Sequence, residues 1–209
     1  KSTELPLEKN NGTDGVSLMK MKIRPRATIS LIVGGLMLFG ILGTILGNGD
    51  DAKKPLAVGD AIPEITLQGS DGKTHALHEV SKNGEALILA WIPKTFTPGW
   101  TRQCKALRDS AEELKKYKVK LYVISCDNLE KTKKFAEELG NKFPILADPE
   151  RKASVLFGVD RVFGLSKRVT FIFDNKGKLV EIDKKVNLGS HGKDIVTKLD
   201  ELKIEKREE

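Results

Sequence analysis

The hydrophobic pattern of the chain is that of an α/β domain between residues 56 and 204. Unbroken apolar runs at residues 86–92 and 120–125 predict central strands that are covered on both faces of a sheet. Apolar residues recur at helical spacing in three stretches, which are residues 101–116, 129–139 and 192–202. The alternation of these elements predicts a mixed central sheet flanked by helices.

Short polar turns predict two hairpins within the same domain. The first joins strands at residues 62–67 and 74–77 through the sequence Ser-Asp-Gly-Lys. The second joins strands at residues 169–173 and 178–182 through Asp-Asn-Lys-Gly. These hairpins add antiparallel strands to the sheet, which makes it mixed.

One apolar segment stands apart from this pattern. Residues 27–47 contain no charged side chain, and about 20 apolar residues suffice for a helix to cross a bilayer. We therefore expect one transmembrane helix before the α/β domain, with a cleaved signal segment as the rival interpretation. Basic residues precede the segment and Asp50 and Asp51 follow it, so we expect a membrane-anchored protein whose C-terminal domain is extracytoplasmic, either periplasmic or at the cell surface. The remaining segments are a disordered basic N-terminus, a linker and a charged tail, at residues 1–26, 48–55 and 205–209.

The composition excludes several kinds of function. The chain has 209 residues, of which 39% are hydrophobic and 31% charged, enough for one packed domain. Of its net charge of +7, +3 lies in the first 28 residues and the other +4 is spread over mixed Lys/Glu helix faces, so we expect no nucleic-acid partner. Cys104 and Cys126 are too few for a disulfide framework. His75, His78 and His191 lack ligand spacing, so we interpret them as surface or capping residues and expect no metal and no cofactor.

The candidate chemistry lies where the central strand at residues 86–92 passes into the next helix. Sites in open α/β sheets lie beyond the carboxyl ends of the strands. A helix that begins there presents free backbone N–H groups and the positive end of its dipole. A thiol in that first turn is shifted toward thiolate. This connection contains Pro93, Thr97 and Trp100, and Cys104 follows one turn later.

The connection resembles the active-site segment of the peroxiredoxin family, which includes alkyl hydroperoxide reductases, thiol-specific antioxidant proteins and bacterioferritin comigratory proteins. The family signature is Pro-x-x-x-Thr-x-x-Cys. Pro93 and Thr97 match it, and the cysteine position falls on Trp100. Further motifs agree over residues 56–202, and they are Leu107-Arg108-Asp109, Ser125-Cys126-Asp127, Phe135-Ala136, the segments 143–149 and 157–159, and the segment 168–174. Thioredoxins proper are less similar, because they carry a CxxC motif and a cis-proline where this chain has Val169.

The resemblance implies a thioredoxin-like fold and a peroxidase mechanism. In such enzymes a thiolate attacks the O–O bond of a peroxide and becomes a sulfenic acid. A thioredoxin-like protein or a low-molecular-weight thiol then reduces it. By resemblance, Thr97 and Arg168 hold the thiolate and the peroxide oxygens, and Pro93 shields the intermediate. The alternative for Arg168 is a surface salt bridge. The family also allows a homodimer.

Trp100 departs from the family at the position that carries the reaction, because indole is neither a nucleophile nor a redox thiol. One hypothesis is an inactive relative whose pocket is filled by the ring. The other is a misread selenocysteine, since UGA encodes selenocysteine and some translation tables read it as Trp. Some peroxiredoxin-like selenoproteins carry Phe-Thr-x-Gly-Sec-Thr-x-x-Cys-Lys-x-Leu-Arg, and the stretch from Phe96 to Arg108 is very similar.

The two cysteines have different expected roles. Cys104 lies four residues after position 100, on the same helix face, and would be the resolving thiol if position 100 held Cys or Sec. Cβ atoms at this spacing are ~5–6 Å apart, whereas a disulfide needs ~3.5–4.5 Å, so the first turn would have to loosen. Cys126 follows a buried strand and is either close to the pocket or a small core residue.

Two functions follow from these observations. The first is a thiol- or selenol-dependent peroxidase that reduces hydrogen peroxide and alkyl hydroperoxides with a thioredoxin-like reductant. The alternative is a catalytically inactive, membrane-anchored binding module that retains the peroxiredoxin fold. The identity of residue 100 decides between them.

Overall fold

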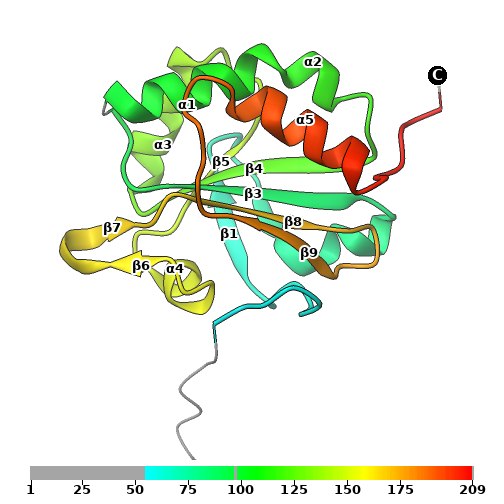
Figure 1. Ribbon diagram of the computed structural model, residues 1–209. Coiled ribbons are helices and arrows are strands. Elements are labelled where there is room, and N and C mark those ends of the chain that lie inside the picture. The colour runs from blue at the N-terminus through cyan, green and yellow to red at the C-terminus, as the bar shows by residue number, and fades with distance from the viewer. Residues whose placement is uncertain (1–54, 97, 209) are drawn as a thin grey trace, which may run out of the picture. The chain divides into compact units, whose positions relative to one another are not determined.

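The computed structural model describes residues 55–96 and 98–208, and its central element is β3 (Ala86–Ile92) (Figure 1). Every residue of β3 is buried. Its even-numbered side chains pack into one hydrophobic core and its odd-numbered side chains into a second, as the alternation of side chains along a strand requires. The unbroken apolar run in the sequence is therefore explained by burial on both faces.

Seven strands form one mixed sheet in the order β2-β1-β5-β4-β3-β8-β9. The strands other than β3 are β1 (Thr66–Gly69), β2 (Thr74–Ala76), β4 (Val119–Ser125), β5 (Ile145–Ala147), β8 (Val169–Phe173) and β9 (Leu179–Asp183). β3, β4 and β5 are parallel to one another, and the remaining pairs are antiparallel. The prediction of a mixed central sheet is confirmed.

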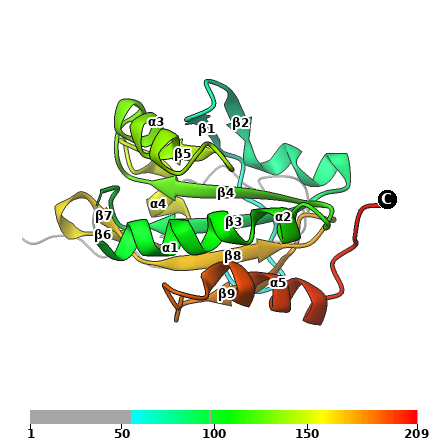
Figure 2. The same cartoon turned by 90° about the horizontal axis from the view of Figure 1, so that it is seen from above.

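Helices cover the sheet on both faces (Figures 1 and 2). One face carries α1 (Pro98–Asp109), α2 (Ala111–Leu114), α3 (Leu129–Glu138) and α5 (His191–Glu201). The other carries α4 (Lys152–Leu156) and the 3-10 turns Leu77–Glu79 and Ser81–Asn83. A small arm precedes β8 and consists of β6 (Asp160–Arg161), a turn (Val162–Gly164) and β7 (Leu165–Ser166). We call residues 160–166 the β6–β7 arm.

Two predicted elements differ from the structure. The strand expected at residues 62–67 starts only at Thr66, because Ala61 pairs with Lys178 beside β9 and Pro63 has no N–H to continue a ladder. All other elements predicted within residues 56–204, except the first helix, agree within one residue at each end.

The helix expected at residues 101–116 is two helices. It begins earlier, at Pro98, since proline in the first position needs no N–H partner. It ends at Asp109, and the amide of Ser110 donates to the carbonyl of Leu107 at 3.2 Å. This tight turn separates α1 from α2.

Four short elements, β5, α4, β6 and β7, were not predicted from the sequence. Each of these elements has five residues or fewer. Segments of this length are too short to show a period of hydrophobic residues.

Within residues 55–96 and 98–208, none of the helices has the length and hydrophobicity of a membrane span. The transmembrane helix predicted at residues 27–47 lies outside the described residues, as do the predicted segment 1–26 and the linker up to residue 54. At the other end, the first residues of the charged tail pair with the domain: the amide of Lys118 donates to the carbonyl of Glu205 at 2.8 Å, and the amide of Arg207 to that of Lys116 at 2.7 Å.

Gly192 allows α5 to pack closely on α1. A Cβ at residue 192 would collide with the carbonyl oxygen of Ala106 and lie 2.5 Å from Oγ of Ser110. Gly192→Ala is expected to lower the free energy of unfolding by about 1–3 kcal/mol, because overpacking outweighs the better helix propensity of alanine. Urea denaturation measures this change. Lys193→Ala, at the exposed neighbouring position, is the control and should have little effect; equal stability of both variants would contradict the close contact.

Candidate active site

The connection between β3 and α1 is held in place by Asp127, from the loop after β4. Oδ2 of Asp127 accepts hydrogen bonds from the amide of Thr95 at 2.6 Å and from its Oγ1 at 2.9 Å. It also accepts one from Oγ of Ser125 at 2.8 Å. All three residues are buried. A buried carboxylate with several donors thus ties the ends of the two parallel strands together. No role for Asp127 was predicted from the sequence.

The predicted shielding residue Pro93 lies directly after β3 and is partly buried. The preceding carbonyl, that of Ile92, accepts a hydrogen bond from Oγ of Ser166 at 2.8 Å, which ties this connection to the β6–β7 arm. Phe96 has a left-handed backbone (φ 59°) and packs edge-on against Phe135. Thr97 lies outside the described residues, so its role stays a prediction.

Trp100 and Arg168 meet at the N-terminal turn of α1. The indole is 3% exposed, and the Cζ atom of Arg168 lies 4.6 Å from the ring centroid, within the range of a cation–π contact. A Cβ at Gly99 would lie 3.5 Å from Nη2 of Arg168, so the guanidinium lies beside the helix start. Partial burial lowers the pKa of Arg168.

Arg168 forms no ion pair with a carboxylate among the residues that the structure describes. The alternative of a surface salt bridge for Arg168 is therefore wrong for this part of the chain. The cation is instead partly withdrawn from water, next to position 100, where the resemblance to peroxiredoxins predicts an anionic nucleophile. A negative charge at residue 100 would offset the cost of that desolvation.

Cys104 lies in the same hydrophobic core as Trp100 and is fully buried. Burial raises the pKa of the Cys104 thiol to about 12, although the charge of Arg168 acts in the opposite direction. At neutral pH the sulfur is therefore a protonated thiol, and the thiolate is the nucleophilic form. In this conformation Cys104 is a weak nucleophile.

His191 is part of the core beneath the site, so its prediction as a surface or capping residue is wrong. It is 1% exposed. Its Nδ1 lies 3.1 Å from Nε2 of Gln103, and its Nε2 lies 2.8 Å from Oγ1 of Thr170. Because the amide nitrogen of Gln103 can only donate, Nδ1 of His191 accepts, and its Nε2–H donates to Oγ1 of Thr170. The burial of the ring, with a smaller effect of the Arg168 charge, lowers the pKa of His191 to about 4.

The sequence offered no signal for this network. Its three members come from α1, β8 and α5, far apart along the chain. Single polar residues at such positions look like ordinary surface residues until tertiary packing brings them together.

Cys126 is half-buried and belongs to neither hydrophobic core. Burial raises the pKa of its thiol, and a hydrogen bond with Ser154 opposes that shift. Asp148, Arg151 and Asp160 are its charged neighbours. The structure therefore places Cys126 beside α4, whereas Trp100 and Cys104 lie in the core under α1.

Known proteins match this chain in both sequence and fold. The AhpC/TSA family model matches residues 58–182. Peroxiredoxin Bcp of Escherichia coli (strain K12) is 33% identical over 135 residues, which covers 61% of this chain and 85% of that protein. Peroxiredoxin Bcp of Bacillus subtilis (strain 168) is 31% identical over 143 residues, which covers 65% of this chain and 90% of that protein.

Solved structures agree with this match. Peroxidoxin BcpB from Mycobacterium tuberculosis superposes with a TM-score of 0.63 at 27% identity, over 69% of this chain and 97% of that chain. The bacterioferritin comigratory protein of Xanthomonas campestris gives a TM-score of 0.62 at 24% identity, over 68% and 99%, which is a likeness of fold. The predicted thioredoxin-like α/β fold is confirmed.

The two cysteines should differ in their reaction with iodoacetamide. We expect Cys126 to be alkylated first at pH 8, because it is partly exposed, while Cys104 stays protected by burial and by its raised pKa. Mass spectrometry of peptides after timed labelling measures both rates, and the unfolded chain in urea is the control in which the rates should converge. Faster labelling of Cys104 in the native protein would contradict its burial.

His191 should make the fold sensitive to acid. Its pKa is lower in the folded state than the unfolded value of 6.5, so its contribution to stability is present above pH 6.5 and is lost as the pH falls toward about 4. The loss is on the order of 3 kcal/mol. Urea denaturation at pH 7 and pH 4.5 should show a smaller difference for His191→Gln than for the parent protein. An unchanged difference would contradict this assignment.

Proposed function

Because the chain belongs to the AhpC/TSA family, a family of peroxiredoxin-type oxidoreductases, we propose that it is a peroxidase whose nucleophile stands at position 100. The proposed nucleophile is a selenol, with selenocysteine read as Trp100, or in engineered form a thiol. The proposed substrates are hydrogen peroxide and alkyl hydroperoxides. The proposed reductant is a thioredoxin-like protein or a low-molecular-weight thiol.

The observation that carries this proposal is the position of Arg168. Its guanidinium lies over the side chain of residue 100, beside the first turn of α1, and has no carboxylate partner among the described residues. A cation and a helix N-terminus both stabilise an anion at this point. A selenolate or thiolate at residue 100 would be the anion that these groups favour.

The proposed reaction has two chemical steps. The selenolate attacks one oxygen of the peroxide, the O–O bond breaks, and the other oxygen leaves as water or an alcohol after taking a proton. Selenium is oxidised to a selenenic acid and the peroxide is reduced. Arg168 stabilises the developing charge on the oxygens, and Pro93 and Thr97 take the shielding and hydrogen-bonding roles that the family implies.

Cys104 is the proposed resolving residue. Its thiol would attack the selenenic acid, form a selenium–sulfur bond and release water. The dithiol of a thioredoxin-like protein, or two molecules of a low-molecular-weight thiol, would then supply two electrons, become a disulfide, and restore the selenolate and the Cys104 thiol. In the described conformation Cys104 is fully buried. Resolution therefore requires the first turn of α1 to open, as the spacing of the two residues also demands.

The alternative is an inactive binding module with a genuine tryptophan. The fit of the indole favours it, since Trp100 is almost fully buried and stacks on Arg168. The codon for residue 100 separates the two proposals. UGA followed by a selenocysteine-insertion hairpin supports the selenoenzyme, and UGG supports the binding module.

We further propose that residues 27–47 anchor the protein in a membrane and that the α/β domain lies outside the cytoplasm. The support is the uncharged apolar segment, its basic N-terminal flank and its acidic C-terminal flank. A peroxidase in this location would act on peroxides at the cell surface or in the periplasm.

We expect Trp100→Cys to create peroxidase activity in the chain as written. The second-order rate with hydrogen peroxide should exceed that of a free thiol, because Arg168 and the helix N-terminus favour the thiolate. Adding Arg168→Ala should lower this rate by about 100-fold, whereas adding Arg161→Ala, at an exposed arginine on the β6–β7 arm, should leave it unchanged. Stopped-flow assays with dithiothreitol measure these rates.

The parent protein and a Cys104→Ser, Cys126→Ser variant are the controls, and both are expected to show negligible turnover. A Trp100→Cys rate no higher than that of a free thiol, or one indifferent to Arg168, would favour the binding module.

A further inference from the structure

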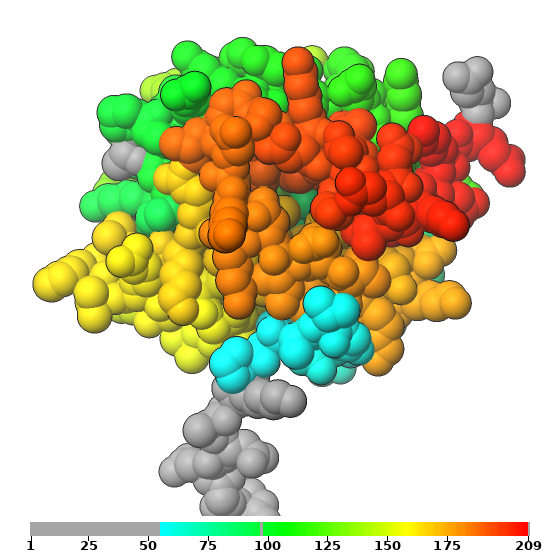
Figure 3. Space-filling model, in the orientation of Figure 1, coloured from blue at the N-terminus to red at the C-terminus, as the bar shows by residue number. Residues whose placement is uncertain are grey.

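The tip of the β6–β7 arm carries two exposed apolar side chains. Val162 is 70% exposed and Phe163 is 94% exposed. Phe163 also has a left-handed backbone (φ 61°), a conformation that bulky residues rarely adopt. Figure 3 shows the arm projecting from the body of the domain. An aromatic ring held in water by a strained turn suggests a binding role for this tip.

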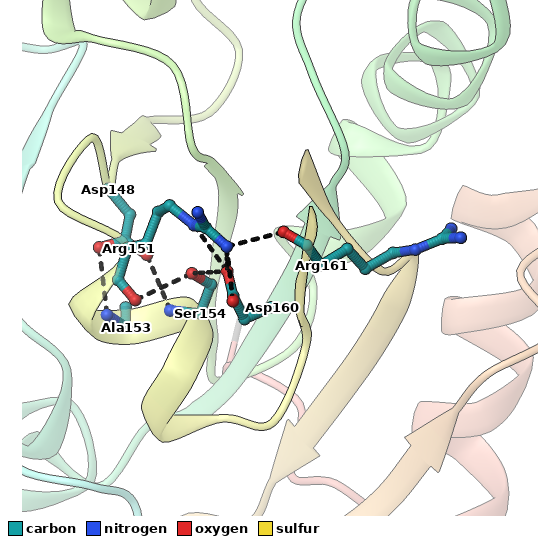
Figure 4. Close-up of polar contacts among 6 residues, drawn as sticks. All are labelled: Asp148, Arg151, Ala153, Ser154, Asp160 and Arg161. Atoms are coloured by element: carbon teal, nitrogen blue, oxygen red, sulfur yellow. Dashed lines mark hydrogen bonds and ion pairs between the residues drawn. The ribbon is translucent and has the colours of Figure 1, made fainter. Parts of the chain in front are cut away.

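The arm is fixed at its base, as Figure 4 shows. Nε of Arg151 donates to Oδ1 of Asp160 at 2.7 Å, and Nη2 donates to Oδ2 at 2.6 Å. The same Nη2 donates to the carbonyl oxygen of Arg161 at 2.7 Å. Asp148 accepts hydrogen bonds from the amides that begin α4, including that of Ser154 at 2.7 Å. The bidentate ion pair between Arg151, at the start of α4, and Asp160, at the start of β6, therefore holds the tip of the arm in one orientation.

The arm lies beside the point where the described chain begins. A Cβ at Gly158 would lie 3.9 Å from Cβ of Pro55, and Gly158 lies two residues before β6, the first strand of the arm. The neighbouring Val155 of α4 is 63% exposed. In Figure 3 the start of the described chain (cyan) adjoins the segment that carries α4 and the arm (yellow).

Cationic side chains accompany these apolar ones. Nζ of Lys167 donates to the carbonyl oxygen of Gly158 at 3.1 Å and is exposed. The guanidinium of Arg161 is also exposed and forms no ion pair within residues 55–96 and 98–208. Apolar and aromatic side chains flanked by Lys and Arg match the chemistry of an anionic membrane surface.

We propose that the tip of the β6–β7 arm binds the lipid surface, with Val162 and Phe163 inserted at the level of the headgroups and Arg161 and Lys167 facing anionic lipids. This inference rests on the proposed membrane anchor at residues 27–47. Residues 48–54 span at most about 25 Å when fully extended, so an anchored domain stays within that distance of the bilayer at Pro55. Gly158, two residues before the arm, adjoins Pro55, so the short tether favours lipid as the occupant of the tip.

The arm also connects the membrane contact to the candidate active site. β7 ends two residues before Arg168, and Ser166 of β7 donates to the carbonyl oxygen of Ile92 at the end of β3. Contact of the tip with lipid would therefore orient the Arg168 side of the domain relative to the bilayer. A second copy of the chain and a soluble protein are the competing occupants of the tip.

The test places a tryptophan on the arm of the full-length chain. Phe163→Trp and the control Glu113→Trp, on α2 across the sheet from α4, are reconstituted into vesicles of phosphatidylcholine and phosphatidylglycerol with brominated acyl chains. The emission of Trp91 and Trp100, recorded on the parent protein, is subtracted. We expect the bromine atoms to quench the tryptophan at residue 163 and not the one at residue 113. Quenching should decrease when phosphatidylglycerol is omitted.

Several results would overturn the proposal. Equal quenching at residues 163 and 113, or none at either, rejects the arm contact and leaves the anchor intact. Failure of the full-length chain to float with the vesicles rejects both the anchor and the contact. A concentration-dependent dimer in detergent that Phe163→Ser abolishes assigns the tip to a second copy. The peroxide assay of Trp100→Cys is separate, so failure of the proposed enzymatic function is recognised independently.

Discussion

The burial of β3 on both faces is the constraint on which the other elements depend. A strand whose side chains all enter a core must have helices on each side of the sheet, and its carboxyl end must lie inside the domain. A short connection leads from the carboxyl end of β3 into α1. The N-terminus of α1 therefore lies at the edge of the sheet where the parallel strands end. Asp127 fixes this connection from the neighbouring parallel strand. The candidate site follows from this arrangement, because residue 100 lies in the first turn of the helix.

The site contains a positive charge, that of Arg168, which no carboxylate among the described residues pairs with. Arg168 is partly desolvated and lies over a neutral indole, while the nearest sulfur, that of Cys104, is a buried thiol with a raised pKa. His191 is held neutral by its own burial. The surroundings thus favour an anion at residue 100, and the residue written there carries no charge. A misread selenocysteine would remove this conflict, and a genuine tryptophan would fill the same space by stacking.

The parts of the structure that could be predicted from the sequence share a physical cause. Long elements with a buried face carry a period of hydrophobic residues, and β3, β4, α3, β8 and α5 were found within one residue at each end. The family motif located Pro93, Trp100, Cys104 and Arg168, and the structure brings Trp100, Cys104 and Arg168 into one neighbourhood. Short elements such as β5 and α4 were missed, because three to five residues cannot display a period.

The sequence alone determined the α/β order, the family and the position at which chemistry is expected, since these depend on local periodicity and on contiguous motifs. Only the tertiary structure decided which polar side chains share an environment. It buried His191 between Gln103 and Thr170, gave Asp127 its anchoring contacts, and placed Cys126 beside α4. It also left Phe163 exposed at the tip of the β6–β7 arm and placed Gly158, just before that arm, beside Pro55. Contacts of this kind join residues far apart along the chain, and their burial and charge exist only once the two cores have formed around β3.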